Sequence, residues 1–216
     1  MEQLNIEYNF TSESRSFCQD CDFLKSRCLC DTLKVIPNNV HLIVLQHPSE
    51  SKHPLNTVRI MKKSFKEMTV LVGENFTSDL ILNTLLCDPN NECALLYPGD
   101  EATVLNADAP KAQITHLILL DGTWRKAKKI FMLSHNLHTL PSIKLAPETT
   151  SDYRIRKAPS DQSLSTLEAS TMALQYLEPT LDTSAAILSF QKMVDFQIKK
   201  MGREVYQTNY LDKKKD

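Results

Sequence analysis

Four short apolar runs, each bounded by polar or turn-forming residues, constrain the fold of this chain most strongly. They span residues 40–46, 68–73, 93–97 and 116–120, and each has the length of a buried strand. Patterns with helical spacing follow three of them, over 54–65, 78–86 and 123–133, and Ser78 is expected to cap the second helix. A short strand is expected over 142–145, and helices over 165–177 and 183–201. This alternation predicts an α/β fold whose mostly parallel sheet is flanked by helices on both faces.

The overall composition narrows the class of protein. The 216 residues carry a formal net charge of −1, so any nucleic-acid binding must use a local basic patch. The N-terminus lacks the pattern of a secretory signal, and no apolar run approaches the roughly 18 residues of a membrane span. We therefore expect a cytoplasmic protein that binds neither membrane nor DNA. Only four glycines occur and no G-x-G-x-x-G follows a strand, which argues against a Rossmann dinucleotide site.

Four of the six cysteines form a cluster near the N-terminus with the pattern C-x2-C-x6-C-x-C. The members of this cysteine cluster are Cys18, Cys21, Cys28 and Cys30. Thiolates at such short spacings can converge on one tetrahedral zinc ion, and the polar segment between them cannot build a core of its own. Two disulfides, or four unrelated thiols, are the alternatives. We expect a structural zinc module over residues 1–36, followed by one α/β domain over 37–216.

The turn after the apolar run 116–120 is the strongest candidate for a ligand site. It reads Asp121-Gly122-Thr123-Trp124, and it leads into a helix. Ligands bind at such strand-to-helix turns in open α/β sheets. Trp124 is the only tryptophan of the chain, and a large aromatic ring beside a carboxylate can stack on a base or line a cofactor pocket.

Polar residues also follow two other expected strands. Gln46 and His47 end the first apolar run, and Glu50 and Asn56 follow shortly after. His47 is either a general base or a residue that Pro48 holds in a rigid turn, and Asn56 either caps the next helix or contacts a ligand.

The other strand end carries the second polar group. Tyr97, Pro98 and Gly99 end the third apolar run, where an acidic turn is the alternative to a ligand contact.

Basic residues occur in two places that suit an anionic partner. Arg154 and Arg156 project to the same side if their segment is extended, and Arg125 and Lys128 belong to a cationic helix face after Trp124. That face is either simply solvated or a platform for RNA phosphates. The sequence from Ser165 to Glu168 fits a helix capping box, which explains Glu168 without a ligand.

Taken together, these segments resemble the DTW-domain family, the tRNA-uridine aminocarboxypropyltransferases. The resemblance extends from Cys18 to about Leu177 and rests on several segments in a fixed order. They are the cysteine cluster, 45–50 with Asn56 and Thr57, 95–98, 120–124 with Ala127, 140–141, and 153–156 leading to 165–169. The cysteine cluster and the small size indicate the bacterial type of the family and a uridine in the variable loop of tRNA.

The resemblance implies a fold, a donor and a reaction. The fold would be similar to that of SPOUT methyltransferases, with a trefoil knot in the chain. The donor would be S-adenosylmethionine, whose 3-amino-3-carboxypropyl group passes to N3 of a tRNA uridine and leaves methylthioadenosine. The alternatives are a SPOUT-like RNA methyltransferase, which would leave adenosylhomocysteine, and a zinc-containing RNA-binding module without catalysis.

The implied roles fall on the residues described above. Asp121 would act as the general base or orient a reactant, Thr123 would bind the donor or cap its helix, and Trp124 would stack on a base. The expected donor contacts are Gln46, His47, Tyr97, Pro98, Gly99, Asp121 and Thr166. The expected tRNA contacts are Glu50, Asn56, Arg125, Lys128, Arg154 and Arg156.

Overall fold

The computed structural model describes residues 16–99, 101–105, 113–146 and 164–208. Its strands are β1 (His41–Gln46), β2 (Met68–Val72), β3 (Cys93–Leu96), β4 (Thr103–Leu105), β5 (His116–Asp121) and β6 (Ser142–Leu145). Its α-helices are α1 (Pro48–Ser51), α2 (Val58–Ser64), α3 (Leu80–Cys87), α4 (Trp124–Leu133), α5 (Thr166–Leu177), α6 (Ser184–Met201) and α7 (Arg203–Tyr206). Two short 3-10 helices, η1 (Lys25–Arg27) and η2 (His135–Leu137), complete the described elements.

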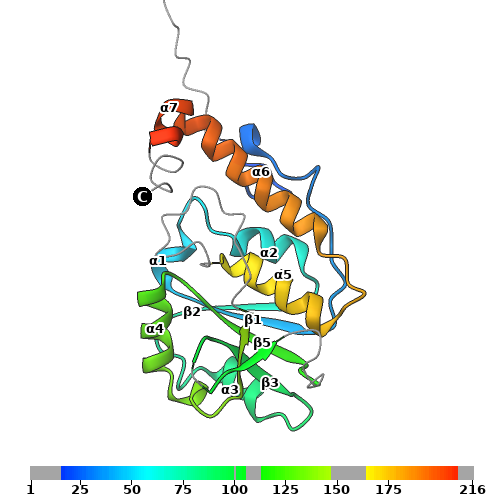
Figure 1. The fold of residues 1–216 in the computed structure, drawn as a ribbon, viewed down its shortest axis with the longest axis vertical. Coiled ribbons are helices and arrows are strands. Elements are labelled where there is room, and N and C mark those ends of the chain that lie inside the picture. The colour runs from blue at the N-terminus through cyan, green and yellow to red at the C-terminus, as the bar shows by residue number, and fades with distance from the viewer. Residues whose placement is uncertain (1–15, 100, 106–112, 147–163, 209–216) are drawn as a thin grey trace, which may run out of the picture.

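The six strands form one sheet in the order β2-β1-β5-β3-β6-β4, and every neighbouring pair is parallel. The parallel α/β sheet predicted from the apolar runs is therefore confirmed (Figure 1). Parallel strands need crossover connections, and most of these connections carry the helices that cover the sheet. β5 lies between β1 and β3, although it follows both along the chain.

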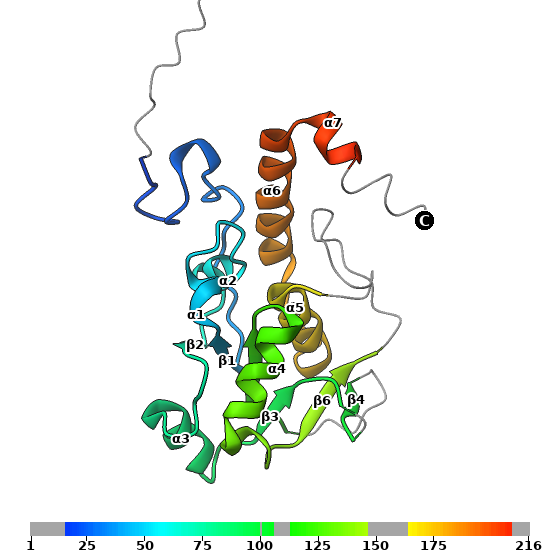
Figure 2. The same ribbon diagram turned by 90° about the vertical axis from the view of Figure 1, so that its left-hand side faces the viewer.

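Each face of the sheet has its own apolar core, because successive side chains of a strand point to opposite faces. On one face Leu42, Val44 and Leu117 pack with apolar residues of α2, α5 and α6. On the other face Ile43 and Ile118 pack with apolar residues of α3, α4 and η2. Figure 2 shows α4 on the opposite side of the sheet from α2 and α5. Among the described helices, none combines the length and the apolar character needed to cross a membrane.

The predicted helix and strand boundaries differ from the structure at several places. The helix expected over 54–65 begins only at Val58, because the side chain of Asn56 accepts the Val58 N–H and ends the preceding turn. Ser78 is not the cap of α3; the Asp79 carboxylate accepts the Leu82 N–H at 2.8 Å and fills that role. The short elements α1 and β4 are absent from the prediction, because four and three residues give too little periodicity to detect.

Candidate functional site

The carboxyl ends of β1 and β5 place Gln46 beside Asp121 in the middle of the sheet. The two residues are register partners, and both side chains are buried. β2, which follows β1 along the chain, lies on one side of this pair, and β6, which follows β5, lies on the other. The strand order thus reverses between β1 and β5, and this is the position at which open parallel sheets bind ligands.

Gln46 and Thr166 donate side-chain hydrogen bonds to the Asp121 carboxylate. Gln46 Nε2 donates to Oδ2 at 2.7 Å, and Thr166 Oγ1 donates to Oδ1 at 2.5 Å. Gln46 Nε2 also lies 3.3 Å from Asn56 Oδ1, and this oxygen accepts the Val58 N–H at 2.9 Å. We call Gln46, Asn56, Asp121 and Thr166 the Asp121 cluster. Asn56 thus accepts the first N–H of α2, as the capping alternative expects, and its contact with a ligand stays a prediction.

The N-terminus of α5 lies beside the Asp121 carboxylate, since Thr166 is the first residue of this helix. The expected capping box is confirmed: Ser165 Oγ accepts the Glu168 N–H at 3.2 Å, and the Glu168 carboxylate accepts the Ser165 N–H at 2.7 Å. A helix N-terminus carries a partial positive charge, which stabilises a nearby carboxylate. The local sequence of α5 thus fixes both a hydrogen-bond donor and a favourable dipole next to Asp121.

The turn after Asp121 brings the start of α4 close to β1. A Cβ atom built on Gly122 would lie 2.9 Å from Lys126 Cβ and 3.6 Å from His47 Cβ, so this position requires a glycine. Thr123 is the N-cap residue of α4, although its side chain makes no capping hydrogen bond. Trp124 begins the helix with 48% of its surface exposed, so its ring is accessible to a partner.

His47 lies on the α4 side of the sheet edge and belongs to a chain of polar contacts. Its Nε2 is 2.7 Å from Glu74 Oε1, and the other oxygen of Glu74 is 2.6 Å from Lys129 Nζ. The hydrogen bond from Lys129 lowers the pKa of Glu74, which keeps this carboxylate ionised as the acceptor for His47. His47 Nδ1 accepts the Ser49 N–H at 3.2 Å and caps α1. These contacts favour the structural role for His47 over that of a free base.

The remaining predicted donor contacts lie around the end of β3. Tyr97 stacks on Phe131 of α4, with ring centroids 4.7 Å apart, and burial raises the pKa of its hydroxyl. Pro98 and Gly99 are exposed, and the Gly99 carbonyl accepts a hydrogen bond from Lys144 Nζ at 3.1 Å. Tyr97 thus packs on α4, and Gly99 is joined to β6 through Lys144.

The predicted RNA contacts other than Asn56, which is described above, divide into three groups. Arg125 and Lys128 are exposed on α4. Glu50 is ion-paired with Lys126 of the same helix at 2.6 Å. Arg154 and Arg156 lie outside the described residues. Their role therefore stays a prediction from the sequence.

Sequence reasoning misses Glu74, which links His47 to α4. An available signal is its position directly after Gly73, where the expected second strand ends. Its partners Lys126 and Lys129 cannot be ranked from the sequence, because four cations occur within five residues of this helix and only the fold shows which ones face acidic groups.

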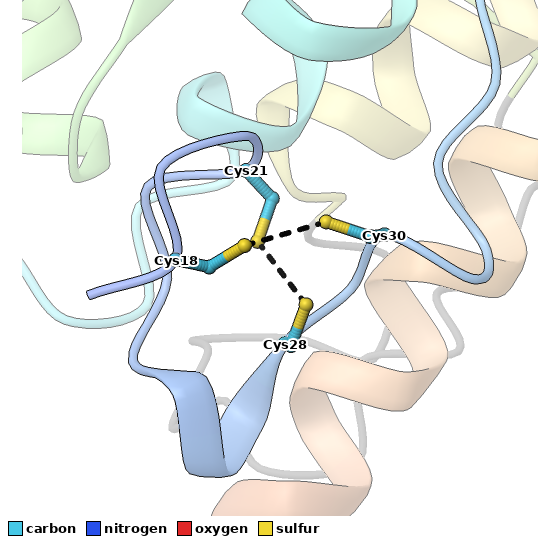
Figure 3. Close-up of side chains that lie close together, drawn as sticks. All are labelled: Cys18, Cys21, Cys28 and Cys30. Atoms are coloured by element: carbon cyan, nitrogen blue, oxygen red, sulfur yellow. Dashed lines mark hydrogen bonds between the residues drawn. The ribbon is translucent and has the colours of Figure 1, made fainter. Parts of the chain in front are cut away.

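The four clustered cysteines converge in space, as Figure 3 shows. Their sulfur atoms all lie within 4.8 Å of one another, with 3.5 Å between Cys18 and Cys30 and 3.7 Å between Cys21 and Cys28. Four thiolates bound to one zinc ion at about 2.3 Å would be about 3.8 Å apart. The donor set and its spacing therefore fit one tetrahedral metal ion, and both fit zinc.

Electrostatic contacts anchor the cysteine segment to α2, and hydrogen bonds within the cysteine cluster raise the pKa of the Cys30 thiol. Hydrogen bonds from the backbone at Cys21 and Asp20 lower the pKa of the Cys18 thiol to about 7. Asp22, which has a left-handed φ of 61°, pairs with Lys63 of α2 at 2.7 Å, and this contact lowers its pKa. Arg59 of α2 lies over the Phe23 ring, 4.3 Å from its centroid.

Comparison with known proteins identifies relatives that are similar to this chain in sequence. The mouse protein named tRNA-uridine aminocarboxypropyltransferase 2 is 34% identical over 196 residues, which cover 87% of this chain and 65% of the mouse protein. The Drosophila melanogaster protein of the same name is 33% identical over 171 residues, covering 76% of this chain and 67% of that protein. The chain thus spans about two thirds of the length of these relatives.

A more distant relative and a family model complete the comparison. The Arabidopsis thaliana protein named tRNA-uridine aminocarboxypropyltransferase A is 26% identical over 216 residues, which cover 86% of this chain and 82% of that protein. No solved structure matches the chain. The model of the DTW domain matches residues 15–198, which include the cysteine cluster, the whole sheet and the Asp121 cluster. The chain therefore belongs to the DTW domain family.

Proposed function

We propose that this protein transfers the 3-amino-3-carboxypropyl group of S-adenosylmethionine to N3 of a uridine in tRNA. The single observation that carries the proposal is the Asp121 carboxylate, held at the switch point of a parallel sheet by Gln46 and Thr166. The names of the relatives from mouse and Drosophila support the same reaction. The bacterial subtype and the variable-loop uridine stay predictions.

The reaction is chiefly a problem of orientation. A bond forms between uracil N3 and the γ-carbon of the donor, the bond from that carbon to the sulfonium breaks, and N3 releases its proton. The sulfonium supplies the chemical activation, so the protein must align N3 with the γ-carbon rather than with the methyl group. Asp121 suits this task because its carboxylate cannot rotate without losing the hydrogen bond from Gln46 or the one from Thr166.

We assign one of two tasks to the Asp121 carboxylate. It accepts the proton of uracil N3, or it accepts a hydrogen bond from the ammonium group of the donor and so holds the donor in place. Either partner, the N3–H of uracil or the ammonium of the donor, presents a hydrogen-bond donor to a carboxylate. Gln46 and Thr166 then act as positioning residues through Asp121. The candidate donor contacts His47, Tyr97, Pro98 and Gly99 remain predictions from the sequence.

The tRNA would approach the exposed start of α4. Trp124 offers a ring for a base, and Arg125 and Lys128 offer charge for phosphates. Flipping of the uridine costs little when its loop is already unpaired. A local patch of this kind also agrees with the net charge of −1, which provides no general attraction to RNA.

Two structural features of the family belong to the same proposal. A zinc ion held by the cysteine cluster would fix the N-terminal segment, as four thiolates leave no open coordination position. A SPOUT-like knotted fold is supported by the strand order, because β5 enters between β1 and β3, and β6 enters between β3 and β4. Each of these insertions returns the chain to a position between strands formed earlier.

The decisive experiment incubates the purified protein with tRNA and S-adenosylmethionine and identifies both products by mass spectrometry. We expect an aminocarboxypropyl uridine and methylthioadenosine. Methylated nucleosides with adenosylhomocysteine would instead identify a methyltransferase, and RNA binding without donor binding would identify a non-catalytic module. Asp121→Asn should lower the rate by at least about 100-fold while the chain stays folded, because a positioned acid-base group contributes about this much.

A further inference from the structure

Helix α4 has two flanks of different chemistry. At 3.6 residues per turn, Trp124, Lys128 and Phe131 lie on one flank, and Lys126 and Lys129 lie on the other. Figure 2 shows this helix in front of the sheet, with β3 beside it. The flank with Trp124 and Phe131 faces the end of β3, because Tyr97 stacks on Phe131 with the two ring planes 17° apart.

The ring contacts continue past the end of α4. His138 lies against Phe131 with ring centroids 4.7 Å apart, and its Nε2 is 2.9 Å from the Phe131 carbonyl oxygen. His135 meets His138 edge to face, with 5.5 Å between centroids. Both histidines are exposed, and Phe131 and Tyr97 are half-buried. We call Trp124, Tyr97, Phe131, His138 and His135 the ring strip.

The two flanks of α4 also differ in how their lysines are paired with acidic residues. Lys126 and Lys129 are neutralised by Glu50 and Glu74, each at 2.6 Å. Within the part of the chain that the structure describes, no ion pair involves Lys128, and its side chain is exposed one turn after Trp124. The flank that carries the rings therefore also keeps an uncompensated positive charge.

We infer that the ring strip binds unpaired RNA bases that flank the modified uridine, with their phosphates toward Lys128. This inference rests on the proposed function and extends it by naming the surface that holds the loop. Rings interleaved with a free cation are the chemistry of single-stranded RNA recognition, because every base offers a π-face and every nucleotide a negative charge. A duplex does not fit the strip, as its bases are already stacked on one another.

The test compares two RNA probes and three variants of the full chain. One probe is a stem-loop with an unpaired loop that contains uridine, and the other closes the same sequence into a duplex. His138→Ala and Phe131→Leu each remove a ring, and Met132→Ala removes an exposed apolar side chain of the same helix as the matched control. Thermal unfolding establishes that each variant is folded.

We expect loss of either ring to weaken stem-loop binding about fivefold or more, by the known scale of base stacking on aromatic rings. Binding of the duplex should not change, and Met132→Ala should bind both probes as the unaltered chain does. The single tryptophan reports directly on the strip: stem-loop RNA should quench its fluorescence, and inorganic polyphosphate should not.

The failure of this inference is distinct from the failure of the proposed function. Suppose that the unaltered chain forms the aminocarboxypropyl product and that the ring variants keep its KM for tRNA and its affinity for the stem-loop. RNA binding by the ring strip would then be refuted, and the proposed function would hold. Equal weakening for loop and duplex would also overturn the strip. If no product forms but the ring variants lose only their affinity for the stem-loop, RNA binding by the ring strip is confirmed and the proposed reaction is refuted.

Discussion

The cysteine cluster and the Asp121 cluster are assembled in opposite ways. The cysteine ligands lie within thirteen positions of one another, whereas Gln46 and Thr166 are 120 positions apart and meet only in the folded chain. In the Asp121 cluster both carboxylate oxygens accept hydrogen bonds from protein side chains. In the cysteine cluster four sulfur atoms face one another and suit a shared cation. The Asp121 cluster is a product of the fold, whereas the cysteine cluster would stabilise the fold through the zinc ion proposed above.

The largest expected effect follows from removing a ligand of the proposed zinc site. Cys21→Ser removes one of the four sulfur ligands of the proposed site. Cys21 is also 1% exposed and belongs to the main core, so the change weakens core packing as well as metal binding. We expect loss of the stoichiometric zinc and a loss of about 4 kcal/mol or more in the free energy of unfolding. This corresponds to a fall of about 8–16 °C in Tm for a chain of this size.

The matched control for this change is Cys87→Ser, at an exposed cysteine outside the cluster. It should keep the metal content and the Tm of the unaltered chain. Elemental analysis and calorimetry give both quantities. If Cys21→Ser bound one equivalent of zinc and unfolded at the original temperature, the cysteine cluster would not be a stabilising metal site.

A smaller effect, on activity rather than stability, is expected in the Asp121 cluster. Thr166→Val keeps the shape of the side chain and removes the hydroxyl that donates to Asp121 Oδ1. Hydrogen bonds to charged groups contribute about 1.5–3 kcal/mol, so kcat/KM should fall by roughly 10- to 100-fold. Thr171→Val is the control on the same helix, because its hydroxyl bonds the Glu168 carbonyl instead. Normal turnover by Thr166→Val would remove this hydroxyl from the mechanism.

The opposite ends of β1 and β5 carry a pair of titratable rings. His41 and His116 are stacked with 5.3 Å between centroids, and burial lowers the pKa of both below the usual 6.5, against an opposing effect of Glu67 on His41. The unfolded chain therefore binds protons more tightly than the folded one. The free energy of unfolding therefore has no penalty from this pair above about pH 6.5. It declines as the pH falls from there toward the lowered pKa values, because the unfolded chain takes up protons first.

Calorimetry at pH 7.5 and pH 5.5 measures this decline as a lower Tm in acid. His116→Phe keeps a ring against His41 and removes one titrating group, so its Tm should depend less on pH. A Tm that depends on pH as strongly as in the unaltered chain would refute the assignment to this pair.

The smallest expected effect concerns the ion pair between Glu50 and Lys126. Both side chains are partly exposed, at 20% and 26%, so Glu50→Gln should cost less than about 1 kcal/mol of unfolding free energy. Its KM for tRNA separates two roles for Glu50. An unchanged KM indicates a residue that only holds α4, and a changed KM indicates the direct RNA contact expected from the sequence.

The sheet could be predicted from the sequence because its central strands are continuous apolar runs. β1, β2, β3, β5 and β6 all coincide with expected strands to within one or two residues. β4 could not be predicted, because its three residues become a strand only through pairing with β6. The apolar spacing predicts too early a start for α2, because the side-chain hydrogen bond from the Val58 N–H to Asn56 determines where this helix begins.

The candidate site was predictable in part for a related reason. Strand ends identify Gln46 and Asp121 as neighbours once the sheet is parallel, and the family resemblance adds Thr166. The backbone N–H of His47 donates to the Asp121 carbonyl oxygen at 2.9 Å, but the side chains of His47 and Tyr97 contact Glu74 and Phe131 instead of the Asp121 carboxylate, and this was not predictable. It depends on which face of the sheet each side chain takes after the strand ends, where the two-residue alternation no longer applies.

The position of β5 also determines the order in which the domain can be completed. β1, β2 and β3 leave the ribosome first, but β1 and β3 share no hydrogen bonds and gain a common neighbour only when residues 116–121 have been made. Until then each presents an open edge to other chains. Pairings between segments so distant along the chain form slowly, so the nascent protein depends on a late-arriving central strand before it is safe from aggregation.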